Sequence, residues 1–101
     1  MMLRIIRGKL KPGTWPTYER AYKDTMMKAG KFPGLKARWL ARAVDDPDAG
    51  YTVSVWESEE AMRSYENGEA LKKIILPALE PFFSGDYTTT SCEVRFIEEF
   101  E

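Results

Sequence analysis

Residues 51–56 combine an aromatic side chain with two hydroxyl groups in an order that can build one wall of a ligand pocket. Apolar and polar residues alternate there, and this period of two, rich in β-branched and aromatic residues, predicts a β-strand. The alternation places Thr52, Ser54 and Trp56 on one face of that strand. An indole can pack against a planar ligand, and hydroxyl groups can hydrogen-bond to its polar substituents. Any pocket between the predicted sheet and its helices should therefore have Trp56 on its wall.

A helix is predicted directly after this strand, where it would close the pocket from one side. Ser58 can cap it, because its hydroxyl can accept a backbone hydrogen bond, and two glutamates follow in the first turn, at the positive end of the helix dipole. Met62 and Tyr65 then recur at a spacing of three. An earlier predicted helix presents Tyr22 and Met26 at a spacing of four. These four side chains are the candidates for the helix side of the pocket.

Several kinds of catalytic chemistry are excluded by residues that the chain lacks. It contains no histidine and only one cysteine, Cys92, so it has neither a histidine base nor the ligands of a zinc site. Cys92 lies in a predicted apolar strand, where a thiol is typically packed and inert. Asp45, Asp46 and Asp48 are calcium-like ligands, but Pro47 and the short length are incompatible with an EF-hand loop. We therefore expect no metal site and no bound cofactor.

The balance of charges argues against nucleic acid or a membrane surface as a partner. The 15 basic and 16 acidic residues are interspersed, which leaves no basic patch that would bind a phosphate backbone. No apolar run is long enough to cross a bilayer, and the N-terminus lacks the apolar core of a signal peptide. A single cysteine fits a reducing cytoplasm. Arg4, Arg38 and Arg42 have two open interpretations, contact with an anionic ligand or ion pairs at an interface.

The order of predicted elements indicates an α+β fold in one domain, 1–101. Turn-forming Pro-Gly pairs and a polar connection separate alternating and amphipathic segments. The predicted strands are 2–11, 35–44, 51–57 and 86–98, and the predicted helices are 15–29, 58–67 and a segment from 69 that Pro77 and Pro81 should fragment. This order predicts a ferredoxin-like βαββαβ arrangement, in which helices cover one face of a four-stranded antiparallel sheet.

Both faces of the predicted sheet carry apolar residues, although helices would cover only one. In the second predicted strand, Trp39 lies on one face while Leu40 and Val44 lie on the other. A large uncovered apolar face is unfavourable for a chain of this size. We therefore expect a homodimer in which two copies pack sheet face to sheet face.

The segment 33–66 resembles the antibiotic biosynthesis monooxygenase superfamily of dimeric α+β barrels. The resemblance is carried by Pro33-Gly34 before the second strand, by the connection DDPDAG, and by WESEEA from Trp56 to Ala61. With the matching order of elements it covers almost the whole chain. The WESEEA pattern is typical of the fold rather than of one activity. Members include cofactor-independent oxygenases of aromatic polyketides or quinols, haem-degrading oxygenases and small-molecule isomerases.

The resemblance implies a cofactor-independent monooxygenase that acts on a small phenolic or quinone-like metabolite between the sheet and the helices. A dry pocket that stabilises the phenolate would let this electron-rich anion reduce dioxygen directly. Trp56 is then the candidate catalytic residue, as pocket wall and indole donor. The candidate substrate-binding residues are Tyr22, Met26, Thr52, Ser54, Met62 and Tyr65. The alternative for each is core packing, in a non-catalytic module that binds a small hydrophobic ligand or serves in assembly.

The chain departs from the active members of this superfamily at several positions. Quinone-forming members place an asparagine and a tyrosine beside the tryptophan, and here those positions are Thr52 and Met62. Haem-degrading members use a helix histidine and a strand asparagine, and those positions fall near Ile75 and at Ile6. We therefore expect no haem ligation through imidazole. Haem bound by an unusual ligand, such as Cys92 or a tyrosine, stays a third hypothesis.

Overall fold

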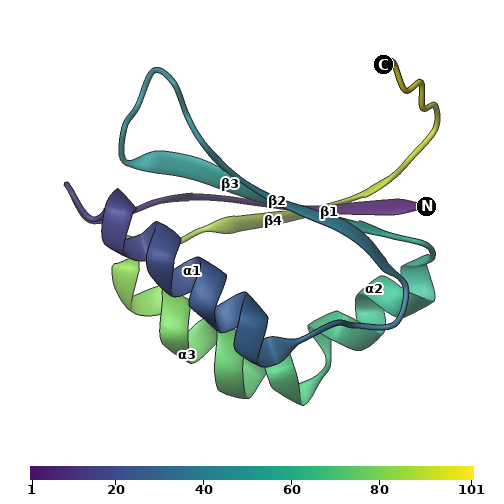
Figure 1. The fold of residues 1–101 in the computed structure, drawn as a ribbon, viewed down its shortest axis with the longest axis horizontal. Coiled ribbons are helices and arrows are strands. Elements are labelled where there is room, and N and C mark those ends of the chain that lie inside the picture. The colour runs from purple at the N-terminus through teal and green to yellow at the C-terminus, as the bar shows by residue number, and fades with distance from the viewer.

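The strands and helices follow one another in the predicted order in the computed structural model, which describes residues 1–101 (Figure 1). The strands are β1 (Met2–Lys9), β2 (Leu35–Arg42), β3 (Ala49–Trp56) and β4 (Thr88–Glu93). The helices are α1 (Trp15–Ala29), α2 (Glu59–Glu66) and α3 (Leu76–Leu79). A π-helical turn (Leu71–Ile75) leads into α3, and a 3₁₀ turn (Glu80–Phe82) follows it. The strand–helix–strand pattern thus occurs twice.

The four strands form one sheet in the order β2-β3-β1-β4, and all neighbours are antiparallel. The central pair, β1 and β3, is in register from Met2 opposite Trp56 to Lys9 opposite Ala49. The edges are β2 and β4, each from a different half of the chain. This is the ferredoxin-like topology, so the predicted α+β fold is confirmed.

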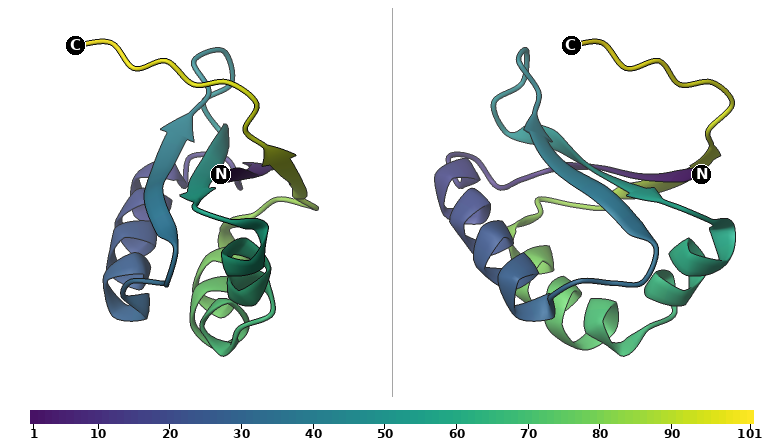
Figure 2. Two further views of the ribbon diagram at one scale, coloured as in Figure 1. Left: turned by 90° about the vertical axis from the view of Figure 1, so that its right-hand side faces the viewer. Right: turned by 45° about the vertical axis from the view of Figure 1, so that its right-hand side comes forward.

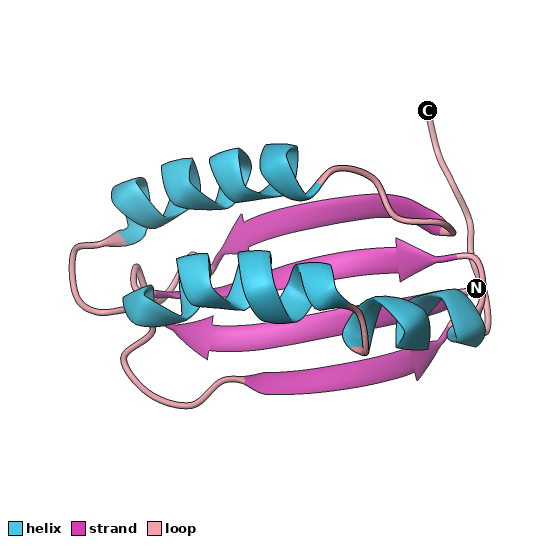
Figure 3. Ribbon diagram, turned by 90° about the horizontal axis from the view of Figure 1, so that it is seen from below, coloured by secondary structure: helices cyan, strands magenta, loops and turns pink.

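All helices lie on the same side of the sheet (Figures 1 and 3). Helix α1 lies toward the β2 edge, and the segment from α2 to α3 lies toward the β4 edge (Figure 2). The opposite face has no helix over it, and Trp39 on β2 is 55% exposed there. None of the helices has the length and apolar character needed to cross a membrane.

Helix α1 packs through one stripe of mostly aromatic residues. Its buried positions, Trp15, Tyr18, Tyr22 and Thr25, recur at spacings of three and four, which places them on one side of the helix. The aromatic members of this stripe pack with Leu10 and with the buried residues of the π turn and α3. The core therefore lies between α1, α3 and the end of the sheet.

Two glycines let aromatic rings approach the backbone of the sheet. Gly8 and Gly50 are paired across β1 and β3. A Cβ atom on Gly50 would lie 2.4 Å from the ring of Trp15, and one on Gly8 would lie 2.5 Å from the ring of Phe83. Both separations are too short for any side chain. The two rings consequently fill the space under this end of the sheet.

The predicted start of α2 and the break in the next helix are both confirmed. The Ser58 hydroxyl accepts a hydrogen bond from the Ala61 backbone N–H at 3.1 Å, as an N-cap residue does. Pro77 follows directly on the π turn, which closes with the Leu76 N–H donating to the Leu71 carbonyl, and proline has no N–H with which to continue these hydrogen bonds. The turn at Asn67 and Gly68 separates α2 from this second helical segment.

The last strand is shorter than predicted. The sequence pattern predicts a strand over 86–98, whereas β4 ends at Glu93. The only neighbour of β4 is β1, whose first residue, Met2, already pairs with Glu93. One more backbone hydrogen bond follows this pair, from the Val94 N–H to the Met1 carbonyl at 2.9 Å. The chain then leaves the sheet (Figure 2), and Phe96 is 77% exposed. Smaller differences of about two residues occur at the ends of the other strands.

Candidate functional site

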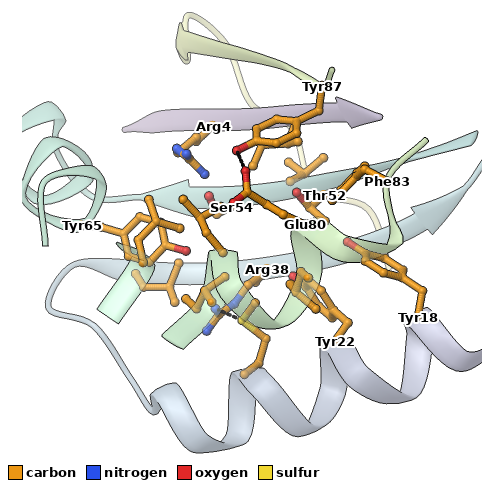
Figure 4. Close-up of a pocket in the computed structure, with 18 of the residues that line it drawn as sticks. Arg4, Tyr18, Tyr22, Arg38, Thr52, Ser54, Tyr65, Glu80, Phe83 and Tyr87 are labelled. Carbon is orange, nitrogen blue, oxygen red and sulfur yellow. Dashed lines mark hydrogen bonds between the residues drawn. The ribbon is translucent and has the colours of Figure 1, made fainter. Parts of the chain in front are cut away.

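A cavity lies between the sheet and the helices, at the end of the strand that carries Trp56 (Figure 4). Its volume is about 60 Å³, and 14 of its 19 lining residues are hydrophobic. For comparison, an engineered apolar cavity of about 150 Å³ takes up one benzene molecule. The cavity as it stands therefore holds only a few water molecules. An aromatic ligand must push its side chains apart or extend toward its opening.

The structure brings together all but one of the predicted site residues. The residues that line the cavity are Trp56, Tyr22, Met26, Thr52, Ser54 and Tyr65. Met62 does not line it, although it is 0% exposed. Met62 lies one turn nearer the start of α2 than Tyr65, where the helix packs against β1 and β3. Helical spacing places both residues on one side of α2, but only Tyr65 reaches the cavity.

The indole of Trp56 is fixed by contacts within the protein. Its Nε1–H donates a hydrogen bond to the Ser54 hydroxyl at 2.9 Å, and the residue is 1% exposed. Its ring lies 5.0 Å from the ring of Tyr65, which in turn meets the edge of Phe32 at 4.9 Å. Trp56 is therefore a rigid wall, and its N–H is already engaged by Ser54. The Ser54 hydroxyl, which accepts this bond, keeps its own proton to donate.

Two arginines flank Ser54 on the sheet side of the cavity. Arg38 on β2 and Arg4 on β1 are each the direct cross-strand neighbour of Ser54 on β3. Both arginines line the cavity, and their side chains lie on opposite sides of Ser54 in Figure 4. Adjacent strands are about 4.8 Å apart, so the two arginine backbones are separated by about 10 Å. The three residues form a continuous row, Arg38–Ser54–Arg4, across three strands.

The two arginines differ in their partners. The Nε of Arg4 donates to a Glu66 carboxylate oxygen at 2.9 Å, and this ion pair is mostly buried. Arg38 has no carboxylate within ion-pairing distance. Its guanidinium donates instead to the thioether sulfur of Met26 and lies 5.9 Å from the centre of the Phe32 ring. A thioether is a weak acceptor, so the charge of Arg38 is not neutralised by the protein.

Tyrosine hydroxyls supply further donors to the cavity. Burial raises the pKa of Tyr22 to about 12, and the positive charge of Arg38 opposes this rise. Burial also raises the pKa of Tyr65, against the opposing charges of Arg4 and Arg38. Both phenols therefore stay protonated at neutral pH. Neither has a hydrogen-bond partner in the protein, so both can donate to a ligand.

One carboxylate also lines the cavity. Glu80, in the 3₁₀ turn after α3, accepts a hydrogen bond from the hydroxyl of Tyr87 at 3.0 Å (Figure 4). Tyr87 lines the cavity as well. Its pKa is raised mainly by burial and, to a smaller extent, by this hydrogen bond. The arginine row and the Glu80–Tyr87 pair give the cavity wall charges of both signs.

A second, smaller cavity continues along the sheet toward the paired glycines. Its volume is about 20 Å³. Ile6, Tyr18, Thr52 and Phe83 line both cavities and so stand between them. The space under the sheet is thus divided by side chains.

No sequence pattern predicts Glu80 or Tyr87 as site residues, and Arg4 and Arg38 keep two interpretations at the level of sequence. The alternation in β1 and β2 contains a usable signal, because Arg38 shares its face with Leu40 and Arg4 shares its face with Ile6. The pairing register that places both arginines beside Ser54 is a long-range property. No local pattern marks Glu80, because its side chain enters the cavity from a turn created by the neighbouring prolines.

The fold and the cavity together define a class of small α+β proteins, with a ferredoxin-like sheet and a small, mostly apolar cavity between that sheet and its helices. Within this class, the family model for antibiotic biosynthesis monooxygenases matches residues 1–75. The chain belongs to this family, as the WESEEA pattern indicated. No curated protein matches the chain significantly.

Solved structures with low sequence identity share the fold. A putative antibiotic biosynthesis monooxygenase from Bordetella bronchiseptica is 14% identical, with a TM-score of 0.81 over 94% of this chain and 97% of its own. One from Nitrosomonas europaea is 9% identical, with a TM-score of 0.79 over 95% and 100%. An arginine-to-serine mutant of MhuD, with two manganese protoporphyrin IX bound per active site, is 22% identical, with a TM-score of 0.81 over 99% and 100%.

The residues of this cavity do not fit a haem group. A porphyrin is several times larger than benzene, and this cavity of about 60 Å³ is already well below the roughly 150 Å³ that takes up one benzene molecule. Ile75, near the position of the helix histidine in haem-degrading members, is a buried apolar residue of the wall. Cys92 is paired with Leu3, and its side chain therefore lies on the face of the sheet away from the cavity. We derive no chemistry through haem for this chain.

Proposed function

We propose that this protein is a cofactor-independent monooxygenase that oxidises a small phenolic or quinol-like metabolite in the cavity beside Trp56. The observation that carries the proposal is a mostly apolar cavity beside the fixed indole of Trp56, in which the unpartnered hydroxyls of Tyr22 and Tyr65 can donate to a ligand. Membership of the monooxygenase family supports the same class of reaction.

The proposed reaction balances without any other reductant. A phenol with a free ring C–H reacts with one dioxygen to give a quinone and one water. The C–H bond and the O–H bond of the phenol break, one oxygen atom becomes the new carbonyl, and the other leaves as water with both hydrogens. The phenolate is the electron donor and dioxygen is the oxidant.

The residues of the cavity would contribute orientation and charge stabilisation rather than bond chemistry. Trp56 and Tyr65, whose rings are tilted by 36° to each other, form a wall that can hold a planar ring in one orientation. The Tyr22 hydroxyl can hydrogen-bond to the oxygen on which negative charge develops. The mostly hydrophobic lining excludes water from the reduced oxygen intermediate.

The test is oxygen uptake with a panel of hydroquinones and anthrones, each compared between the wild type and three variants. Trp56→Phe should slow uptake about tenfold or more, because a smaller ring orients the ligand less well. Tyr22→Phe removes only a hydroxyl and should lower kcat about 100-fold if that donor stabilises the anion. Tyr51→Phe, on the open face of the sheet, is the matched control and should retain the wild-type rate.

Equal rates for the wild type, Trp56→Phe and Tyr22→Phe would contradict the proposal. Binding of the same phenols without oxygen uptake would instead assign the alternative function, a non-catalytic ligand-binding module.

We further infer that two copies pair through the open face of the sheet. Trp39 and Tyr51 are exposed on this face, and the helices cannot cover it. Burying a tryptophan against a partner recovers the apolar area that it leaves in water. Light scattering should give the mass of a dimer for the wild type and of a monomer for Trp39→Lys. A monomeric wild type would contradict this arrangement.

A further inference from the structure

We propose that the ligand of this cavity binds as an anion, with its charged oxygen held over Ser54 between the guanidinium groups of Arg38 and Arg4. The inference rests on the proposed function in one respect, that the cavity beside Trp56 is the ligand site. It adds the chemical class of the ligand, an aromatic molecule that carries a carboxylate or an ionised phenol.

The first argument is the unbalanced charge of Arg38. A partly buried cation is normally paired with an anion, because an unpaired charge loses hydration without compensation. Arg38 has only the sulfur of Met26 and the ring face of Phe32 as partners. These soft contacts position the guanidinium at the cavity wall but leave most of its five N–H donors free. An anionic ligand would supply the missing partner.

Arg4 strengthens this end of the cavity. Its Nε is engaged by Glu66, which leaves the terminal nitrogens of the guanidinium without a hydrogen-bond partner in the protein. Glu66 is shared, because Arg63 also donates to it at 2.8 Å. One carboxylate therefore faces two arginines at this point, and the positive charge of Arg4 is only partly balanced.

The row places both charges on the same wall of the cavity. Arg38 and Arg4 are the two cross-strand neighbours of Ser54, so their side chains rise from the same face of the sheet on either side of it. The Ser54 hydroxyl accepts the indole N–H of Trp56 and can donate its own proton. Donors from three neighbouring strands thus line one wall of the cavity. A neutral ligand would leave the two guanidinium groups as they are, whereas an anion would pair with both.

One ligand class in the proposal carries its charge on a carboxylate, which is ionised at neutral pH whether or not it is bound. A pair of probes that differ only in this charge tests for such a ligand. Binding of 4-hydroxybenzoate and of 4-hydroxybenzamide is measured by calorimetry under nitrogen, so that no oxidation takes place. The carboxylate should bind at least about tenfold more tightly to the wild type, because it makes charge-assisted hydrogen bonds that the amide lacks. This preference should shrink as the salt concentration rises.

The other ligand class in the proposal is a phenol that ionises when it binds, and a coloured phenol tests for it. The anion of 4-nitrophenol absorbs visible light, so a titration of the bound probe reports its ionisation directly. The wild type should lower the pKa of the bound phenol, with about a tenfold gain in the fraction ionised at a pH below its free pKa. A probe bound away from the arginine row would titrate as it does in water.

Two matched variants show whether Arg38 is responsible. Arg38→Met removes the charge and keeps an unbranched apolar side chain, and it should abolish both effects. Arg42→Met makes the same change on the same strand at an exposed position outside this cavity, and both effects should persist. Thermal unfolding of both variants, followed by circular dichroism, shows that each is folded when the probes are added.

The outcomes separate the two sources of the anion. A carboxylate preference that Arg38→Met abolishes supports the proposal and identifies a permanent acid, whereas an ionisation shift alone supports it and identifies a phenolate. Equal affinities with unchanged ionisation overturn it, as does failure of every probe to bind. Charge-selective binding in a protein that never consumes oxygen would overturn the proposed function and leave this inference standing.

Discussion

The hydrogen bond between Trp56 and Ser54 provides a measurable test of how dry the cavity wall is. Ser54→Ala removes the only acceptor of a buried indole N–H, which is 2.9 Å from the serine oxygen. A buried donor left without a partner costs about 1–3 kcal/mol. For a chain of this length, each kcal/mol lowers Tm by about 4–8 °C. We therefore expect Ser54→Ala to melt roughly 10 °C below the wild type.

A double-mutant cycle isolates this hydrogen bond from other effects of the substitution. In a Trp56→Phe background there is no indole donor, so Ser54→Ala should cost little. The two substitutions should therefore show a coupling free energy of about 1–2 kcal/mol. Urea unfolding followed by far-ultraviolet circular dichroism gives these values without relying on tryptophan fluorescence.

A matched control is available in the same row of the sheet. Ser91 is the neighbour of Arg4 on the edge strand β4, and its hydroxyl has only a 3.4 Å contact with Arg63. Ser91→Ala should change the free energy of unfolding by less than about 0.5 kcal/mol. A similarly small loss in Ser54→Ala would refute the reasoning, because it would mean that water replaces the serine beside Trp56.

Three further predictions concern packing and titration. Gly50→Ala would place a Cβ 2.4 Å from the Trp15 ring and should cost about 1–3 kcal/mol in urea unfolding, so an unchanged midpoint would contradict this packing. Burial acts to raise the pKa of Glu66, but hydrogen bonds from Arg63 and Arg4 outweigh it and lower the pKa. The ionised Glu66 carboxylate stabilises the fold above its ordinary pKa of 4.5, and this stabilisation is lost as the pH falls through the lowered pKa. In thermal melts across that pH range, the Tm of Glu66→Gln should therefore fall less steeply with acid than that of the wild type. The pKa of Tyr22 is raised to about 12, so its neutral form stabilises the fold below pH 10 and this contribution, up to about 2 kcal/mol, is lost as the pH rises toward 12. Tyr22→Phe should lack that alkaline loss, and parallel pH dependence of the two proteins would contradict burial of the phenol.

Much of the fold is predictable from the sequence because the signals are local. The alternation before Trp56, the capping hydroxyl of Ser58 and the spacing of the α1 aromatics each depend on a few neighbouring residues. The end of β4 is different. The apolar residues of 94–98 look like a continued strand, but a strand also needs a neighbour, and β1 has no residues left to pair with them.

The site is predictable only where it coincides with these local patterns. Trp56 and Thr52 follow from alternation within one strand, whereas the row formed by Arg38, Ser54 and Arg4 depends on the order of three strands. Met62 is the reverse case, a residue that the local pattern predicts in the site but that does not line the cavity. Its spacing is right for the inner side of α2, but the position of the cavity along that helix is set by packing that the spacing does not encode.

The side chains that separate the two cavities limit the size of the molecule that can bind. Phe83 and Tyr18 separate the larger cavity from the smaller one, and the rings of Phe83 and Trp15 pack directly on the backbone at Gly8 and Gly50. Replacing Phe83 with a smaller residue would open the larger cavity toward the smaller one, while Arg38, Ser54 and Arg4 stay in place on the sheet. In this fold the reach of the ligand space along the sheet is thus set separately from the charged row beside Trp56.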